Sequence, residues 1–326
     1  MNVRRRLIPA ALASALGLGA LTACSSDSAA TGNTDKFDVV ASFYPMAFLA
    51  EQIGGDHANV TSLTEPGQEP HDLEISTKQR AQLEEADAAL FLKGLQPAVD
   101  EAVAQTGIKT KIDAATLTTL EDHGTGGHSH EGEEGHSEEG HAEEEGHAEE
   151  EEHARDPHIW LDPVKYAEVA EGVGKAFEKA DPENAADYAK NTAALVKKLN
   201  GLNADFENGL KNTRTKVFFT NHAAFGYLAE RYGLTQEAIS GLDPESEPSG
   251  ARVRELQEEA KADGVTTVFY ETLVSDKTAK TLARDANLKT DVLDPLEGIT
   301  GKSRGDDYFQ VMEANLKALQ KALGAK

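Results

Sequence analysis

The sequence predicts an α/β protein of two lobes, each built around a mostly parallel sheet, with one long rigid helix between them. From Phe37 onward, short apolar segments alternate with amphipathic segments, the pattern of strands and helices in which the strands pair in parallel. Residues 181–211 separate two rounds of this alternation and carry apolar side chains at the spacings of a helix. A helix of this length would extend over roughly 46 Å.

The first round of the alternation predicts an N-terminal lobe at residues 37–180. Strands are expected at 37–43, 60–63, 88–92 and 110–113. Helices are expected at 45–53, 76–85 and 98–106, and a further helix near Pro163. The second round predicts a C-terminal lobe at residues 212–326. Its strands are expected at 217–220, 237–239, 266–270 and 290–293, and its helices at 224–232, 251–262, 277–286 and 308–323.

The linking helix is expected to begin at Asp181 and Pro182. Aspartate is a good N-cap, and proline suits the first helical turn. Gly201 is the weak point of the segment, because glycine is a poor helix former. Two shorter helices that meet at Gly201 are therefore the alternative.

The N-terminus has the features of an export signal at residues 1–23. Arg4, Arg5 and Arg6 precede an apolar run at 7–21, which is too short to span a bilayer as a mature helix. The run ends in Leu-Thr-Ala-Cys, which resembles a bacterial lipobox, and Cys24 is the only cysteine of the chain. We expect Cys24 to be lipidated and to anchor the protein outside the cytoplasm, with residues 24–36 as a flexible tether. A plain secretory peptide is the alternative.

Charge and cysteine content limit the function. The net charge is −25, and removal of the three arginines of the signal gives −25 − 3 = −28. Such a charge disfavours nucleic acid as a partner and favours cations. With its one cysteine acylated, the chain can form no internal disulfide and no thiolate metal site. Any metal must therefore be bound by histidine and carboxylate.

Residues 121–153 form a tract rich in histidine and glutamate. Between positions 121 and 152 there are six histidines and fourteen acidic residues, and a loose Gly-His-(Ser/Ala)-Glu-Glu unit recurs. So little apolar surface cannot offset the entropy of ordering, so we expect a disordered loop. Imidazole and carboxylate together suit divalent cations of the zinc, copper and nickel type. The weak metal sites are expected at His123, His128, His130, His136, His141, His147 and His153. An acidic, solvated linker is the alternative.

Three of the four remaining histidines lie at ends of predicted elements. His71 is in a loop after the strand that ends at position 63, His158 precedes the helix near Pro163, and His222 directly follows the strand 217–220. Sheets of this kind place ligand sites beyond the carboxyl ends of their strands. Asp294 ends a strand at the same edge. Three imidazoles and one carboxylate form a tetrahedral site that suits zinc.

Other roles for the neighbouring residues stay open. Glu271, which follows a strand, is a competing carboxylate, and Glu69 beside His71 is a further one. Either could instead accept a hydrogen bond from an imidazole and orient it. His57 has no comparable setting and is expected at the surface. A zinc hydrolase would keep an open metal position for water, and the chain has no His-Glu-x-x-His pair, so we expect no enzyme.

Several motifs together resemble one family. They are Ser42-Phe-Tyr-Pro, Pro70-His71-Asp, Asp156-Pro-His158-Ile-Trp-Leu-Asp-Pro, Thr220-Asn-His222-Ala-Ala-Phe-Gly-Tyr, Glu247-Pro-Ser and Leu293-Asp294-Pro-Leu. The chain from Phe37 onward resembles the metal-binding solute receptors of bacterial ABC transporters, the zinc and manganese group called cluster A-I. The resemblance implies two α/β lobes bridged by a long helix, with the metal in the cleft between them.

The resemblance also implies a ligand set and a function. His71 and His158 would come from the first lobe, and His222 and Asp294 from the second. The manganese branch usually has glutamate in place of His222, and the histidine-rich insertion is similar to that of the zinc branch. We therefore expect a monomeric receptor that captures Zn²⁺ as its transported ligand and delivers it to an ABC permease. Glu69 replaces a small residue of the family, so it could enter the site. A manganese or iron receptor of the same fold, or a surface metal buffer or adhesin, is the alternative.

Overall fold

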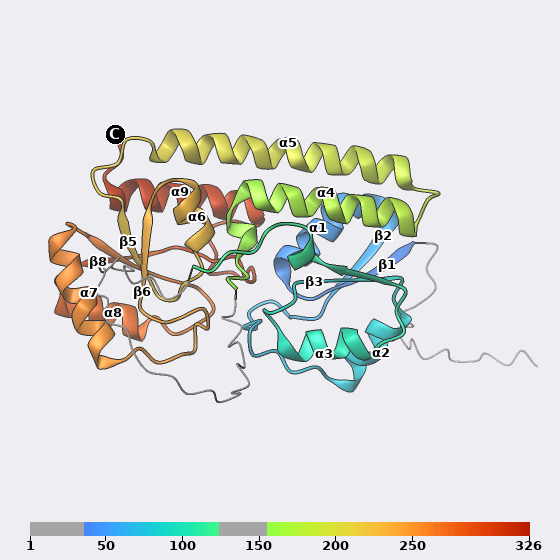
Figure 1. Cartoon of the computed structure of the whole chain (residues 1–326), viewed down its shortest axis with the longest axis horizontal. Helices are drawn as coiled ribbons and strands as arrows, with labels where there is room; N and C mark the ends of the chain where they lie inside the picture. The colour runs from blue at the N-terminus through green and yellow to red at the C-terminus, as the bar shows by residue number, and fades with distance from the viewer. Residues whose placement is uncertain (1–35, 124–154) are drawn as a thin grey trace, which may run out of the picture. The chain divides into compact units, whose positions relative to one another are not determined.

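The computed structural model describes residues 36–123 and 155–326, which contain two four-stranded parallel sheets with helices on their faces (Figure 1). This architecture confirms the α/β fold class. Within these two ranges, none of the helices has the length and apolarity that a bilayer crossing requires. The predicted signal peptide, Cys24, the tether up to position 35 and the tract histidines from 128 to 153 lie outside the described residues.

The first sheet has the strand order β2-β1-β3-β4. Its strands are β1 (Phe37–Ala41), β2 (Ala58–Ser62), β3 (Ala88–Phe91) and β4 (Thr110–Asp113). The helices of this lobe are α1 (Tyr44–Gly54), α2 (Thr77–Glu85) and α3 (Pro97–Gln105). Central strand β1 is buried on both faces: Val39 packs in the cluster that contains α1, and Val40 in the cluster that contains α2 and α3. This two-sided burial explains why the strand is apolar along most of its length.

The second sheet repeats the plan with the order β6-β5-β7-β8. Its strands are β5 (Val217–Thr220), β6 (Thr235–Ala238), β7 (Thr267–Tyr270) and β8 (Lys289–Val292). Its helices are α6 (Gly226–Arg231), α7 (Gly250–Ala262), α8 (Lys277–Asp285) and α9 (Tyr308–Leu323). Phe219 packs with α7 and α8 on one face, while Phe218 packs with α9 in the cluster on the other. Both sheets are thus covered on both sides.

Two antiparallel helices, α4 (Pro163–Ala180) and α5 (Ala185–Leu210), pack on one another, and α5 extends over both lobes (Figure 1). Helix α5 continues through Gly201, so the alternative of two shorter helices is wrong. Helix α5 begins at Ala185 rather than at Asp181, because Asp181 is the residue that ends α4. The carboxylate of Asp181 accepts a hydrogen bond from the Tyr188 hydroxyl at 2.6 Å. The 26 residues of α5 extend over about 39 Å.

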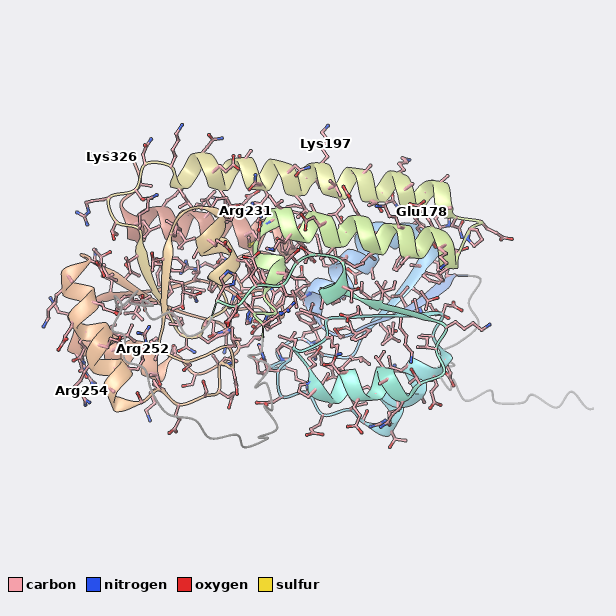
Figure 2. All side chains as sticks on the ribbon, viewed as in Figure 1. Glu178, Lys197, Arg231, Arg252, Arg254 and Lys326 are labelled. Carbon is pink, nitrogen blue, oxygen red and sulfur yellow. The ribbon has the colours of Figure 1, made fainter. Side chains whose placement is uncertain are left out.

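Helix α5 contacts elements of both lobes, α1 on one side and α9 on the other. Its inward stripe of Leu195, Leu199, Leu202 and Phe206 is buried, whereas Lys197 points away from the fold (Figure 2). The stripe belongs to one apolar cluster that also takes in α1, α4, β5 and α9. A core that is continuous between the lobes holds the two sheets in a fixed relation, since close-packed interiors deform little.

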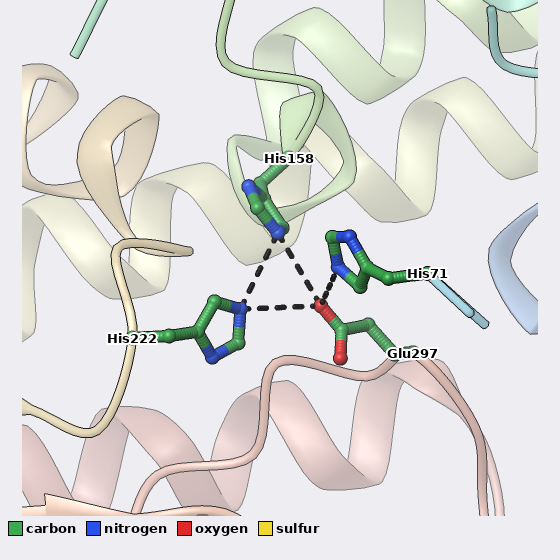
Figure 3. Close-up of side chains that lie close together, drawn as sticks. All are labelled: His71, His158, His222 and Glu297. Atoms are coloured by element: carbon green, nitrogen blue, oxygen red, sulfur yellow. Dashed lines mark hydrogen bonds and ion pairs between the residues drawn. The ribbon is translucent and has the colours of Figure 1, made fainter. Parts of the chain in front are cut away.

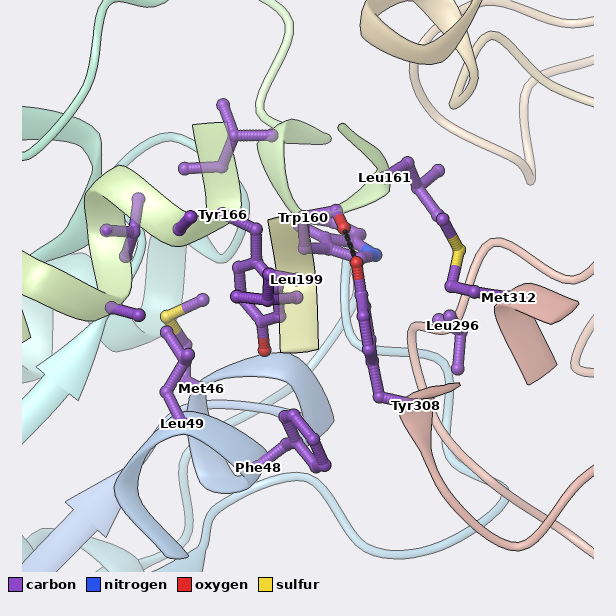
Figure 4. Packing of buried hydrophobic residues seen from close by; sticks show 14 of the residues in the cluster. Met46, Phe48, Leu49, Trp160, Leu161, Tyr166, Leu199, Leu296, Tyr308 and Met312 are labelled. Atoms are coloured by element: carbon purple, nitrogen blue, oxygen red, sulfur yellow. Dashed lines mark hydrogen bonds between the residues drawn. The ribbon is translucent and has the colours of Figure 1, made fainter. Parts of the chain in front are cut away.

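Three aromatic side chains stand at the centre of this shared core (Figure 4). The Tyr308 hydroxyl of α9 donates to the Trp160 carbonyl at 2.6 Å, and the Trp160 indole N–H donates to the Pro295 carbonyl at 2.7 Å. The Tyr166 hydroxyl of α4 donates to the Pro45 carbonyl at 2.6 Å. Each bond joins chain segments far apart in sequence, so these side chains fix the segments that carry the functional residues.

Replacing Tyr308 with phenylalanine is expected to lower the free energy of unfolding by about 1 kcal/mol, because a buried carbonyl loses its hydroxyl donor. Denaturant unfolding followed by circular dichroism measures the loss. Tyr232→Phe is the control. The Tyr232 hydroxyl donates to the partly exposed Asn203 at 3.0 Å, so its removal should lower the free energy of unfolding less. An unchanged stability of the Tyr308 variant contradicts the role given to this bond.

Candidate metal centre

The structure brings His71, His158 and His222 together (Figure 3). Their ring centroids lie 5.3 Å to 6.1 Å apart, and the Nε2 atoms of His158 and His222 are separated by 3.4 Å. His222 follows β5 directly, and His158 precedes a short 3₁₀ turn, Ile159–Leu161, that leads into α4. The convergence expected from the ends of separate elements is thus present in the fold.

The carboxylate that joins the imidazoles is Glu297, which was not among the predicted ligands. Its Oε1 lies 3.2 Å from Nε2 of His71 and 3.3 Å from Nε2 of both His158 and His222. Its side chain is fully buried, and Oε2 has no hydrogen-bond partner among the described residues. One ligand atom of each of these four side chains lies within 4.8 Å of all the others. We call them the cleft group.

Asp294, which was predicted as the fourth ligand, lies outside the cleft group. Its carboxylate accepts hydrogen bonds from the Leu296 N–H at 2.9 Å and the Thr272 hydroxyl at 3.3 Å. Its backbone is held by Asn315 on both sides, through N–H and carbonyl. Leu296 adopts a left-handed backbone with φ of 60°. Asp294 therefore shapes the turn after β8, and the turn presents Glu297 three residues later.

Two further carboxylates orient the imidazoles. Glu271 accepts a hydrogen bond from Nδ1 of His222 at 2.8 Å, and Asp156 accepts one from Nδ1 of His158 at 2.7 Å. With Nδ1 engaged in this way, Nε2 of each ring is directed into the cleft group. The structure thus places Glu271 in the orienting role that the sequence left open for it. Asp156, which was not among the predicted site residues, has the same role.

Glu69 is partly buried and is not a member of the cleft group. Its Oε1 accepts a hydrogen bond from the His71 N–H at 3.1 Å, and Oε2 has no hydrogen-bond partner in the described part of the chain. Burial, reinforced by the negative charge of Glu297, raises the pKa of Glu69 to about 9. Glu69 is therefore a neutral acid at pH 7, and in this form it steadies the loop that carries His71.

The cleft group is also an electrostatic unit. Burial lowers the pKa of His222, but the charges of Glu271 and Glu297 outweigh burial and raise that pKa well above its usual value. Burial also lowers the pKa of His158, but the hydrogen bonds of this imidazole to Asp156 and Glu297 outweigh burial and raise its pKa. Burial acts to raise the pKa of Glu297, but the imidazoles hold it well below its usual value. The carboxylates thus favour the protonated form of these two imidazoles, and the imidazoles favour the ionised form of Glu297.

The other two histidines in the described residues lie outside the cleft group. His57 pairs with Asp187 at 2.9 Å and is partly exposed, in agreement with the surface position expected for it. His123, the first histidine of the tract, lies against Asp156 and Glu230. The weak metal binding predicted for the later tract histidines falls on residues outside the described part of the chain.

Fold and site together define a two-lobed α/β protein with a buried cluster of three imidazoles and one carboxylate, a donor set that suits zinc. The chain belongs to the family described as "ZnuA: Zinc-uptake complex component A periplasmic", which matches residues 39–322.

Relatives include the zinc-binding lipoprotein AdcA of Streptococcus pneumoniae, 37% identical over 315 residues, which cover 92% of this chain and 58% of the relative. The chain thus spans little more than half of that relative's length. The high-affinity zinc uptake system protein ZnuA of Bacillus subtilis is 35% identical over 326 residues, which cover 95% of this chain and 98% of the relative.

Solved structures share the fold. The Zn(II)-bound ZnuA-like domain of Streptococcus pneumoniae AdcA matches with a TM-score of 0.70 and 34% identity, over 88% of this chain and 99% of that chain. The laminin-binding protein Lmb of Streptococcus agalactiae, described as a bifunctional protein with adhesin and metal transporting activity, matches with a TM-score of 0.74 and 29% identity. That match covers 88% of this chain and 99% of the other.

Proposed function

We propose that this protein is an extracytoplasmic receptor that captures Zn²⁺ in the cleft group and delivers it to the permease of an ABC transporter. The observation that carries the proposal is the spacing of the four donor atoms. In a tetrahedral zinc site with ligands at about 2.0–2.1 Å, neighbouring ligand atoms lie roughly 3.3–3.4 Å apart. Of the six separations among the ligand atoms of the cleft group, four measure 3.2, 3.3, 3.3 and 3.4 Å, and all lie within 4.8 Å.

The donor types support zinc over the alternatives. Three imidazoles with one carboxylate suit zinc, whereas carboxylate, carbonyl and water oxygens suit manganese. Because the protein supplies all four donors of a tetrahedral site, no open position remains for a reacting water. This supports a binding protein rather than an enzyme. The zinc-uptake names of the relatives agree with both inferences.

Delivery and location belong to the same proposal. Several relatives are named as zinc-binding lipoproteins or as part of a zinc uptake system, and the lipobox at Cys24 agrees with a lipid anchor. The anchor would hold the receptor at the membrane surface, where a permease lies. His71 is the one imidazole of the cleft group that is measurably exposed, at 11% of its side-chain surface. An ion would therefore enter and leave past His71.

The test is a competition between zinc and manganese for a chain in which six of the seven tract histidines, all except His123, have been replaced. In this protein, the tract variant, His128, His130, His136, His141, His147 and His153 are replaced by glutamine. After equilibration with both metals, the tract variant is expected to retain zinc tightly and to lose manganese on gel filtration. Preferential retention of manganese overturns the choice of metal.

Uptake by cells separates transport from surface buffering. Bacteria whose only copy of the protein carries His222→Ala are expected to lose zinc uptake from dilute medium while their envelope still retains bulk zinc. Cells with His57→Ala, which changes a surface pair, are the matched control and should take up zinc normally. Normal uptake by the His222 variant contradicts the proposal.

A further inference from the structure

A second set of metal-ligating side chains lies where the tract begins. One oxygen or nitrogen atom from each of Glu121, His123 and Glu230 falls within 4.8 Å of the other two. Glu121 and His123 belong to the segment that follows the first sheet, whereas Glu230 is on α6 of the second lobe. These residues, the entry group, share no member with the cleft group.

The imidazole of His123 is held in place by the fold rather than free in solution. Its Nδ1 lies 2.8 Å from Oδ2 of Asp156, and its ring meets the Tyr227 ring edge-on at 4.3 Å. Gly226 makes room for it, since a β-carbon there would lie 2.5 Å from Cβ and Cγ of His123. The position of this imidazole is therefore built into the start of α6.

The backbone of the same segment is fixed to α6 as well. The Tyr227 hydroxyl donates to the Asp156 carbonyl at 2.7 Å and accepts a hydrogen bond from the Glu121 N–H at 2.8 Å. The Asp156 N–H donates to the Glu121 carbonyl at 2.9 Å. Glu121 and Asp156, which lie before and after most of the tract, are thus hydrogen-bonded to each other and to Tyr227 of the second lobe. Glu121 is also a member of the entry group.

The arrangement around His123 is that of a metal ligand with its orienting carboxylate. When Nδ1–H donates to Asp156, the lone pair of Nε2 is directed to Glu230, whose Oε2 lies 3.0 Å away. Metal-binding imidazoles usually donate their second N–H to a carboxylate in this way. The orienting residue is the one that also orients His158, through its other oxygen.

One oxygen atom of each carboxylate of the entry group lies within 4.8 Å of the other. Two ionised carboxylates at such a separation repel, so the arrangement favours a cation between them. Lys165 donates to one oxygen of Glu121 at 2.7 Å and offsets part of the charge. A hollow of about 210 Å³, lined in part by His123, Glu230 and Gln236, adjoins the group. It offers room for water molecules to complete a coordination shell.

We propose that Glu121, His123 and Glu230 form a second divalent-cation site, which binds Zn²⁺ through one imidazole and two carboxylates with water as the remaining ligand. It binds more weakly than the cleft group, because it supplies one imidazole instead of three and Glu230 is exposed. The existence of this site is argued from the geometry of the entry group alone. Its role in uptake, as an intermediate binding site between the tract and the cleft group, rests on the proposed function.

The test is calorimetric titration of the full-length tract variant with Zn²⁺. Two binding events are expected, one tight and one weaker. Glu230→Gln and His123→Gln should each abolish the weaker event or weaken it at least about tenfold, while the tight event remains. Because Glu230 is 59% exposed, its replacement should leave the fold intact. His57→Gln, which removes another histidine paired with a carboxylate, is the matched control and should keep both events.

Two results overturn the inference: a tract variant that binds a single zinc ion, or a weaker event that persists unchanged in Glu230→Gln. The proposed function is tested separately by His222→Ala in the same background. That variant should lose the tight event and keep the weaker one. If the tight event survives His222→Ala, the cleft group fails as the capture site, whatever the entry group does.

Discussion

Replacing Glu297 with glutamine is expected to weaken zinc binding by about 100-fold or more. Removal of residues that only orient a ligand typically costs 10- to 100-fold in metal affinity, and Glu297 lies among the ligand atoms themselves at 3.2–3.3 Å. The amide has the same shape as the carboxylate but lacks its charge, so the three imidazoles remain without their anionic partner. Competition with a chromophoric zinc chelator, in the tract variant, measures the change.

Asp294→Asn is the contrasting variant, because its carboxylate bonds to the Leu296 N–H and the Thr272 hydroxyl and not to an imidazole. We expect a loss of affinity below about tenfold, since the amide oxygen can still accept the bond from the Leu296 N–H and the amide NH₂ can donate to the Thr272 hydroxyl. Circular dichroism of both variants shows whether they fold alike. If Asp294→Asn abolishes tight binding and Glu297→Gln does not, Asp294 is the ligand and the geometry described for the turn after β8 is wrong.

Zinc affinity is expected to rise with pH, by about tenfold per pH unit for each proton that zinc displaces. The neighbouring carboxylates raise the pKa of His158 and of His222 above its usual value, although burial alone would lower it. Zinc binds the neutral imidazole, so a proton must leave first. The gain therefore continues above about pH 6.5, where an ordinary imidazole is already neutral, and ends only at the raised pKa of the folded protein.

Calorimetric titrations at pH 6, 7 and 8, each in two buffers of different ionisation enthalpy, give both the affinity and the number of protons released. We expect at least one proton to be released per zinc ion at pH 7. The surface variant His57→Ala should give the same slope. An affinity that does not change between pH 7 and 8 contradicts the raised pKa values.

The sequence predicted the two sheets well because their physics is local. Strand β1 is buried on both faces, so it is written as an apolar run that can be recognised without its partners. The three histidines of the cleft group were predicted for a related reason. Each stands at the end of an element, and the ends of parallel strands meet at one edge.

What the sequence did not predict depends on contacts made at a distance. Asp294 stands at the end of a strand, where a ligand is expected. A turn with a left-handed residue at Leu296 follows, and it brings Glu297 rather than Asp294 to the three imidazoles. Nothing in the periodicity of the strand marks such a turn. The start of α5 was predicted at Asp181, on the assumption that Asp181 is the N-cap of α5. Asp181 instead ends α4. The ordered position of His123 could not be predicted either, because His123 belongs to the tract and its partners, Asp156 and Glu230 on α6, lie far along the chain.

The spacing of the cleft group has a consequence for unloading. Donors that already stand at their bonding separations lose little freedom when an ion arrives, which favours tight capture. The same fixed spacing gives the four ligands little freedom to move away from a bound ion. The apolar core that the lobes share under α4 and α5 also resists separation of the lobes. If the proposed function is right, we expect release of the ion to require a movement of the loop that carries His71, the one partly exposed imidazole of the cleft group.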